Sequence, residues 1–192
     1  ELRNTPISYE ELLSKKIKGL DISQSDKNMI HSVVLNSMRF HLHIEEILKL
    51  FVKKNITENQ FALLLGAITQ IVYLNFKEYA VVNSTVEIAK QKSVSIFPGF
   101  INAVLKKIII NKKILLKTKV NFNQLPKWFV KKTNSWDVFK KKLFLENIVE
   151  IPELHIVFKN NELLRNFVFK NHVTSEKSVT IKESTLVKNL PN

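Results

Sequence analysis

The sequence contains no cysteine among its 192 residues. This absence excludes disulfide bonds, thiolate metal sites and cysteine nucleophiles within this chain. A glycine-rich loop that would cradle a nucleotide cofactor is also missing, because Gly19, Gly66 and Gly99 are isolated from one another. We therefore expect no cofactor to bind this chain.

Glycine and proline are scarce, with only 3 and 5 residues, while hydrophobic residues make up 45% of the chain. Few turn-forming residues and a large apolar fraction favour a mainly α-helical globular protein. Every hydrophobic run is interrupted by Lys or Glu before it reaches the roughly 20 residues of a membrane span. We expect no membrane partner and a cytoplasmic location.

The residues that carry acid–base or metal chemistry are not grouped. His41 and His43 are two positions apart, but no cysteine or acidic cluster with ligand spacing accompanies them. Glu45 and Glu46 are adjacent, so on a helix they face different directions. The pattern predicts neither a metal site nor a catalytic carboxylate pair, and no catalytic residue is assigned.

Positive charge is the strongest compositional signal, with a net charge of +13. Residues 1–110 hold 14 Lys and Arg against 10 Asp and Glu, whereas residues 111–192 hold 16 against 7. Such a charge attracts polyanions, and RNA is the natural partner. An alternative stays open, because 27 lysines against 3 arginines is also what AT-biased coding produces.

Apolar periodicity and capping residues predict six helices in the first two thirds of the chain. Ser8 and Thr57 begin two of them as capping boxes, and Gly19 ends the first. Gly66 lies inside the central helix, where close approach of another helix would explain it. The expected helices cover residues 8–19, 23–39, 43–51, 57–72, 80–91 and 99–110, and a lysine-rich linker follows to residue 125.

The segment at residues 99–108 combines a helix-start glycine with an apolar stripe and a basic opposite face. Its apolar residues recur at helical spacing and predict one buried face: Ile101, Val104, Leu105 and Ile108. The opposite face, with Asn102, Lys106 and Lys107, is then exposed to solvent. It is interpreted either as a rigid basic binding surface or as an ordinary solvated lysine face. Asn83 and Asn102 are interpreted as residues that cap amides or tie two helices together.

The last third of the chain changes character. Residues 126–133 and 135–147 predict two short helices in which Trp128, Phe129, Val138, Phe139 and Leu143 pack. Trp128 and Trp136 are more often core anchors than platforms for base stacking. Residues 154–158 and 179–181 predict strands that flank a helix at residues 161–170.

Three segments resemble, in order, the motifs of one family. Residues 65–70 resemble an LGAxQ element, residues 80–90 resemble AVNxxVExAK, and residues 99–108 resemble GFVNAVLRRI. These are motifs of the NusB-like RNA-binding domain family, and in particular of the front portion of RsmB-type bacterial 16S rRNA (cytosine-C5)-methyltransferases. Pro126, Trp128 and Trp136 resemble a PxWLxxxW element that is not expected in a free-standing NusB. Residues 151–159 resemble a PPLxLRVN strand, with Val157 where the family has arginine.

The resemblance implies a mainly α architecture in which a NusB-like bundle of two small three-helix units covers residues 1–125. A helical connector is expected at residues 126–150, and the start of a ferredoxin- or RRM-like unit at residues 151–192. The chain begins at Glu1 without methionine and ends at Asn192, where such proteins enter their catalytic domain. We expect a fragment, with S-adenosylmethionine bound by the missing domain.

The function implied is recognition of structured RNA, in particular 16S rRNA, for an rRNA methyltransferase. Two alternatives stay open: a non-enzymatic NusB-like antitermination factor with a protein partner, and a decayed remnant without a task. RNA contacts are predicted for Arg39, Lys77, Lys106, Lys107, Lys131, Lys132, Lys140 and Lys141. Structural motif positions are predicted at Gly66, Asn83, Gly99 and Asn102.

Overall fold

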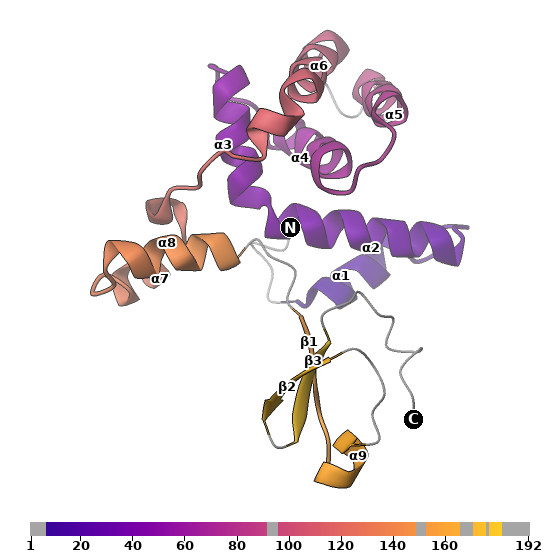
Figure 1. Ribbon diagram of the computed structural model, residues 1–192. Coiled ribbons are helices and arrows are strands. Elements are labelled where there is room, and N and C mark those ends of the chain that lie inside the picture. The colour runs from indigo at the N-terminus through magenta and orange to yellow at the C-terminus, as the bar shows by residue number, and fades with distance from the viewer. Residues whose placement is uncertain (1–6, 92–95, 149–152, 166–170, 176, 182–192) are drawn as a thin grey trace. The chain divides into compact units, whose positions relative to one another are not determined.

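The computed structural model describes residues 7–91, 96–148, 153–165, 171–175 and 177–181 of the chain. The chain divides into two compact units, residues 1–145 and residues 146–192. The first unit is helical and the second contains a small antiparallel sheet (Figure 1). The predicted fold class, mainly helical with an α+β segment at the C-terminal side, is confirmed.

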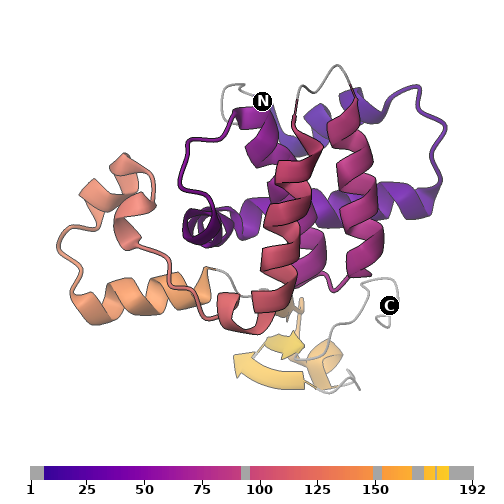
Figure 2. The same ribbon diagram turned by 90° about the horizontal axis from the view of Figure 1, so that it is seen from above.

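The bundle of the first unit consists of six α-helices, with a short π-helix between the fourth and the fifth. They are α1 (Tyr9–Ile17), α2 (Gln24–Arg39), α3 (His41–Phe51), α4 (Glu58–Ile68), η1 (Thr69–Tyr73), α5 (Glu78–Lys90) and α6 (Pro98–Leu115). Figures 1 and 2 show α5 and α6 side by side, with α2 crossing them. Helices α3 to α6 thus bury one face each against other helices of the bundle.

The starts of α1 and α4 follow the polar caps that the sequence predicts. Thr57 accepts a hydrogen bond from the amide of Gln60, whose side chain bonds back to the Thr57 amide, so α4 begins with a full capping box. The Ser8 hydroxyl accepts a hydrogen bond from the Glu11 amide. The Glu11 side chain pairs with Lys15 and does not bond to the Ser8 amide, so α1 begins with only half of a capping box. Gly19 follows α1 with a φ of 83°, the left-handed conformation that glycine adopts without a steric penalty.

The core lies where α4 and η1 meet α3, α5 and α6. The stripe predicted on α6 is confirmed, since Ile101, Val104, Leu105 and Ile108 are all buried. The same helix does not end at residue 110 as predicted but continues to Leu115, which is itself buried in the core. Lysines 112 and 113 therefore belong to the helix and not to a linker.

The α4 helix passes directly into the π-helix η1, which sequence periodicity did not predict. Ser37 of α2 donates a hydrogen bond of 3.0 Å to the Thr69 hydroxyl, which donates to the Leu65 carbonyl at 2.8 Å. Gly66 lies one turn before η1, and a Cβ built on it would have no atom within 4 Å. Close helix approach is therefore the wrong explanation for this glycine.

A second, aromatic cluster follows the bundle within the first unit. It is built from η2 (Phe122–Gln124), α7 (Lys127–Lys132) and α8 (Val138–Asn147). The rings of Phe122, Phe129, Trp136 and Phe144 pack with centroids 4.9–6.2 Å apart. Trp136 is the core anchor that was predicted. The prediction is wrong for four other residues, which are 65%, 84%, 74% and 46% exposed: Trp128, Val138, Phe139 and Leu143.

The second unit has the strand order β1–β3–β2, with both pairs antiparallel. Its elements are β1 (Leu154–Val157), α9 (Asn161–Arg165), β2 (Asn171–Ser175) and β3 (Ser178–Ile181). Because β3 lies between β1 and β2, this is the split βαβ arrangement of a ferredoxin-like unit. The strand β2 was not predicted. Residues 151–152 and 166–170, included in the predicted elements, lie outside the described residues.

Candidate nucleic-acid interface

The helices α5 and α6 form a groove of about 480 Å³ between their exposed sides. The α5 side contributes residues from its first two turns, and the α6 side contributes residues from its middle. The lining residues are Glu78, Tyr79, Val82, Asn83, Asn102, Lys106 and Ile109. The antiparallel pairing of the two helices thus brings residues of two sequence motifs to one surface.

The polar groups of this groove are not used to hold the fold together. Neither Asn83 nor Asn102 makes a side-chain hydrogen bond to another residue that the structure describes. The N-cap positions of the two helices are occupied by Lys77 and Phe97. Within the described chain, the two amides therefore act neither as caps nor as a bridge between helices, and both line the groove.

Two lysines extend this surface along α6. Lys106 lines the groove and Lys107 follows it, and both side chains are exposed. Neither forms an ion pair with a residue of the described segments. The helix carries four lysines and no acidic residue, so its outer face has an uncompensated positive charge that attracts phosphate.

Lys77 is exposed at the N-cap of α5, directly before the groove residue Glu78. The partial positive charge of a helix N-terminus adds to the charge of a lysine at this position. Arg39 ends α2 and is half-buried, with its guanidinium 3.4 Å from the side-chain oxygen of Asn36. The arginine is therefore held on another helix and does not line the α5/α6 groove.

The second predicted group of cations lies on the aromatic cluster. Lys131 and Lys132 end α7 and are exposed, and Lys140 is exposed in the first turn of α8. Lys141 differs, because its ammonium lies 5.5 Å from the centroid of the Phe122 ring in a cation–π contact. Lys141 thus has a structural contact within the aromatic cluster.

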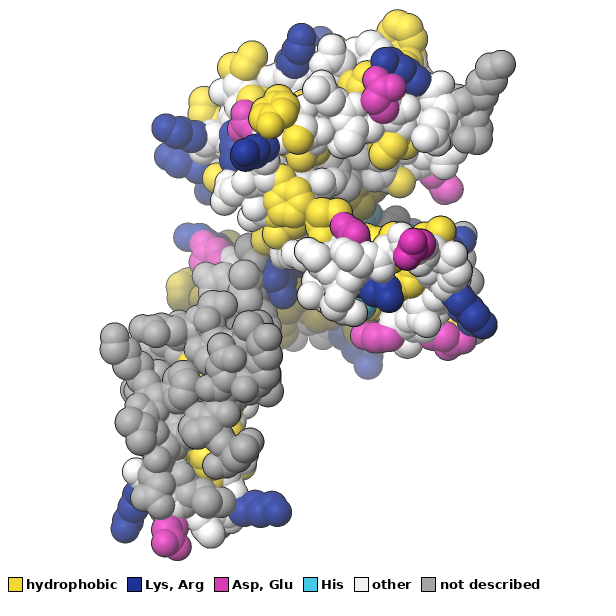
Figure 3. Space-filling model, turned by 90° about the vertical axis from the view of Figure 1, so that its right-hand side faces the viewer, with side chains coloured by type: hydrophobic (Ala, Val, Ile, Leu, Met, Phe, Trp, Pro, Cys, Tyr) yellow, Lys and Arg dark blue, Asp and Glu magenta, His cyan; other side chains and the backbone are white. Residues whose placement is uncertain are grey.

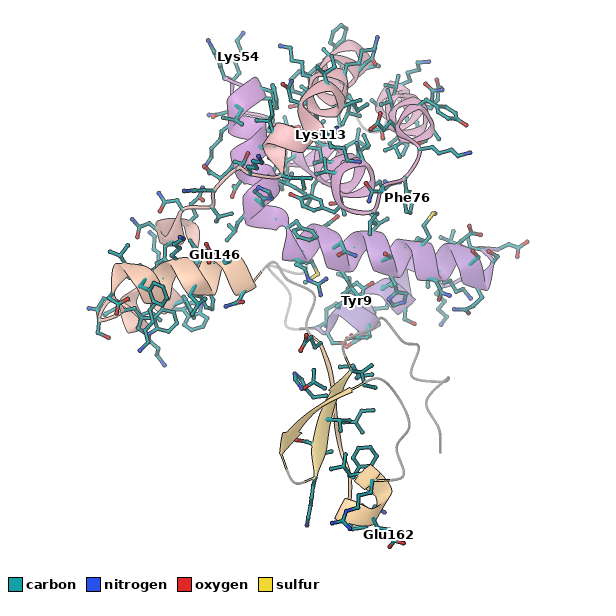
Figure 4. All side chains as sticks on the ribbon, viewed as in Figure 1. Tyr9, Lys54, Phe76, Lys113, Glu146 and Glu162 are labelled. Carbon is teal, nitrogen blue, oxygen red and sulfur yellow. The ribbon has the colours of Figure 1, made fainter. Side chains whose placement is uncertain are left out.

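Among the described residues on the face shown in Figure 3, positive charge forms no continuous patch. Lysine and arginine side chains lie there in small groups, with hydrophobic and uncharged side chains between them. Sticks on the ribbon show long side chains projecting outward, including Lys54 in the segment that follows α3 and Lys113 on α6 (Figure 4). A phosphate backbone would therefore meet local groups of cations.

Gly99 occupies the second position of α6, after Pro98. The first helical position belongs to Pro98, whose fixed φ suits a helix start. A Cβ on Gly99 would lie 2.8 Å from Cε1 of Phe97, whose ring is 72% exposed and can move aside. The close contact alone therefore does not require glycine at this position.

The histidine that sequence analysis considered and rejected as a metal ligand has a structural partner. Nδ1 of His43 lies 2.6 Å from the hydroxyl of Tyr73, and burial favours the neutral form of both groups because it lowers the pKa of His43 and raises the pKa of Tyr73. His43 is 8% exposed, so it belongs to the interior of the bundle.

Sequence reasoning did not single out Tyr79, although its side chain is 68% exposed at the mouth of the groove. Its spacing of four residues from Asn83 places both on one face of α5, which was the available signal. An exposed aromatic residue next to unpartnered amides gives the groove both a flat apolar surface and hydrogen-bonding groups.

Comparison with known proteins gives one family assignment. The sequence profile of the NusB family matches residues 5–109, which include every residue of the α5/α6 groove. The chain therefore belongs to the NusB family, whose domain generally binds RNA. A search of curated proteins finds no match to the chain. Within the described segments, no helix is both long and apolar enough to cross a membrane.

Proposed function

We propose that this chain is the rRNA-recognition region of an RsmB-type, S-adenosylmethionine-dependent 16S rRNA (cytosine-C5)-methyltransferase acting in the cytoplasm. The observation that carries the proposal is the order of units after the NusB domain. The aromatic cluster of α7 and α8 follows the bundle, and a split βαβ unit follows that cluster. A free-standing NusB-like antitermination factor, the alternative function, does not need either addition.

RNA binding in this proposal rests on the cations of the NusB domain. Lys106 and Lys107 project from a helix whose opposite face is fixed in the core, so their ammonium groups are presented on a rigid support. Phosphate contacts from such groups supply sequence-independent affinity. The β1 strand contributes less, because exposed Val157 stands where the family has arginine.

Methyl transfer is assigned to a part of the protein other than this chain. The reaction uses S-adenosylmethionine as the methyl donor and a cysteine nucleophile, and the sequence has no cysteine. Its three glycines lie after α1, inside α4 and inside α6, so they do not form a nucleotide-binding loop. The cofactor therefore does not fit the residues of this chain, which we assign to holding the RNA.

The RNA-binding part of the proposal is tested by charge reversal on α6. A Lys106→Glu/Lys107→Glu variant is compared with wild type in filter binding to a helical 16S rRNA fragment at several salt concentrations. Loss of two phosphate contacts should weaken binding and reduce the log–log salt slope by about 1.4 to 1.8. A Lys15→Glu/Lys90→Glu variant carries the same charge change at lysines paired with Glu11 and Glu87, and serves as control.

If both double variants lose the same affinity, the effect is one of net charge and α6 is not the contact face. The methyltransferase part of the proposal is tested by reading the gene beyond Asn192. A glycine-rich nucleotide loop and two cysteine motifs are expected there. A stop codon at that point in an intact genome would overturn the assignment to an RsmB-type enzyme and leave the antitermination alternative.

A further inference from the structure

We propose that the α5/α6 groove binds one unpaired nucleotide of the RNA, whose base stacks on Tyr79 while the amides of Asn83 and Asn102 bond to its edge. This inference rests on the proposed RNA-binding function and adds a recognised feature to it. The groove has a volume of about 480 Å³ and is open to solvent, so a single nucleotide can lie against its surface.

The aromatic platform is the first argument. Tyr79 is 68% exposed in the first turn of α5, so its ring does not serve the core. Bases that are splayed out of a helix stack on such rings, and stacking is tolerant of base identity because every base has a π-face. Val82 and Ile109 also line the groove and add apolar surface beside the ring.

The two amides are the second argument. Each carries a donor and an acceptor, and within the described chain neither has a side-chain partner. Asn83 comes from α5 and Asn102 from α6, so the groups approach a ligand from both helices. Amide side chains read base edges by paired donor and acceptor contacts, as in the recognition of adenine.

The charged residues that line the groove indicate which groups of a nucleotide it would bind. Lys106 offers a cation to a phosphate, whereas Glu78 offers only acceptor oxygens. A carboxylate accepts hydrogen bonds from the exocyclic amino groups of bases such as cytosine. The groove should therefore prefer an unpaired base with an exocyclic amino group, such as adenine or cytosine, over uracil, which has none.

The experiment uses the full chain and two RNA hairpins of equal length, one fully paired in its stem and one with a single bulged adenosine. Wild type should bind the bulged RNA more tightly. Tyr79→Ala should lose that preference, a decrease of about 5- to 150-fold in affinity for the bulged RNA alone, by the usual strength of base stacking. Tyr79→Phe retains the ring and should retain the preference.

A second pair of measurements addresses the groups assigned to the base edge. Replacing the bulged adenosine by uridine should weaken binding to wild type but not to a Glu78→Ala/Asn83→Ala/Asn102→Ala variant, which lacks all three of these groups. The side chains concerned line an open groove, so melting temperatures should stay close to that of wild type, which circular dichroism verifies. Equal affinity of wild type and both groove variants for every RNA would overturn the inference.

The failure of this inference differs from the failure of the proposed function. If wild type binds paired and bulged hairpins equally, with an affinity that Lys106→Glu/Lys107→Glu reduces, RNA binding stands and the nucleotide site is wrong. If wild type binds neither hairpin at low salt, both proposals fail. If a protein ligand displaces RNA from wild type but not from the Tyr79→Ala variant, the groove is a protein-docking site and the inference is also wrong.

Discussion

The hydroxyl of Tyr73 in η1 lies 2.6 Å from Nδ1 of His43 in α3, which joins the π-helix to the neighbouring helix inside the bundle. The Tyr73 ring also stacks on Phe40, with centroids 3.8 Å apart. Burial favours the neutral form of both His43 and Tyr73, and in that form the pair adds a hydrogen bond without a buried charge.

Acid should destabilise the protein through His43. Burial lowers the pKa of this histidine below its ordinary value of 6.5, so just below that pH the unfolded chain binds a proton that the folded chain does not. The free energy of unfolding should therefore fall as pH decreases from about 6.5, by up to about 1.4 kcal/mol per pH unit for this group, until the pKa of the folded state is reached.

A His43→Gln variant tests this linkage in urea unfolding between pH 7 and pH 5. The variant retains a hydrogen-bonding side chain for Tyr73 but has no proton to gain, so its stability should depend less on pH. His31→Gln changes the histidine that contacts Tyr9 between α1 and α2 and is the control. An equal pH dependence in wild type and His43→Gln would show that His43 does not contribute.

Gly66→Ala should stabilise the bundle by about 0.5–1 kcal/mol, because glycine in a helix is unfavourable relative to alanine and no atom lies within 4 Å of the added methyl group. Gly19→Ala should have the opposite effect, of about 1–2 kcal/mol, because alanine is strained at a φ of 83°. Thermal unfolding of both variants measures the difference. A destabilised Gly66→Ala would mean that the glycine is needed for a reason other than helix propensity.

Two substitutions on α6 should separate its buried and exposed faces. Leu105 is fully buried, so Leu105→Ala should cost about 2–5 kcal/mol of unfolding free energy. Ile110 on the same helix is 82% exposed, so Ile110→Ala should change stability by less than about 0.5 kcal/mol. Chemical denaturation of the pair checks the orientation of the helix, and similar costs for both would show that the assigned stripe is wrong.

Lys141 and Lys140 are neighbours on α8 with different surroundings. Lys141→Ala should cost about 0.5–1 kcal/mol because it removes the cation–π contact with Phe122. Lys140→Ala removes an exposed side chain and should leave stability unchanged. Tryptophan fluorescence during unfolding follows the cluster, since Trp136 lies within it. Equal stability of the two variants would argue that the contact contributes nothing.

The sequence was sufficient to predict the helical part of the fold where local chemistry determines the outcome. Thr57 and Gln60 form their capping box within four residues, and the α6 stripe follows from spacing alone. The strand β2 was missed because Asn171–Ser175 lacks an alternating apolar pattern, and it pairs with β3 across a short turn. Its formation depends on a partner strand, which a local pattern does not reveal.

The candidate site was only partly predictable for the same reason. Lys106, Asn83 and Asn102 were named from motifs, but their meeting in one groove depends on the antiparallel packing of α5 against α6. The orientation of side chains on α8 was also not predictable, because its apolar and charged residues show little segregation along the helix. Phe139 was thus taken as a packing residue although it faces solvent.

The π-helix determines in which direction around the helix axis the residues after α4 face. The Leu74 amide bonds to the Thr69 carbonyl, five residues back, in place of the four-residue interval of an α-helix. Deleting one residue from η1 would restore regular winding but rotate everything after it by about 100° around the helix axis. Tyr73 would then swing away from His43, and α5 would leave α4 in another direction. The extra residue of the π-helix thereby determines the direction in which the chain leaves α4 toward α5 and α6.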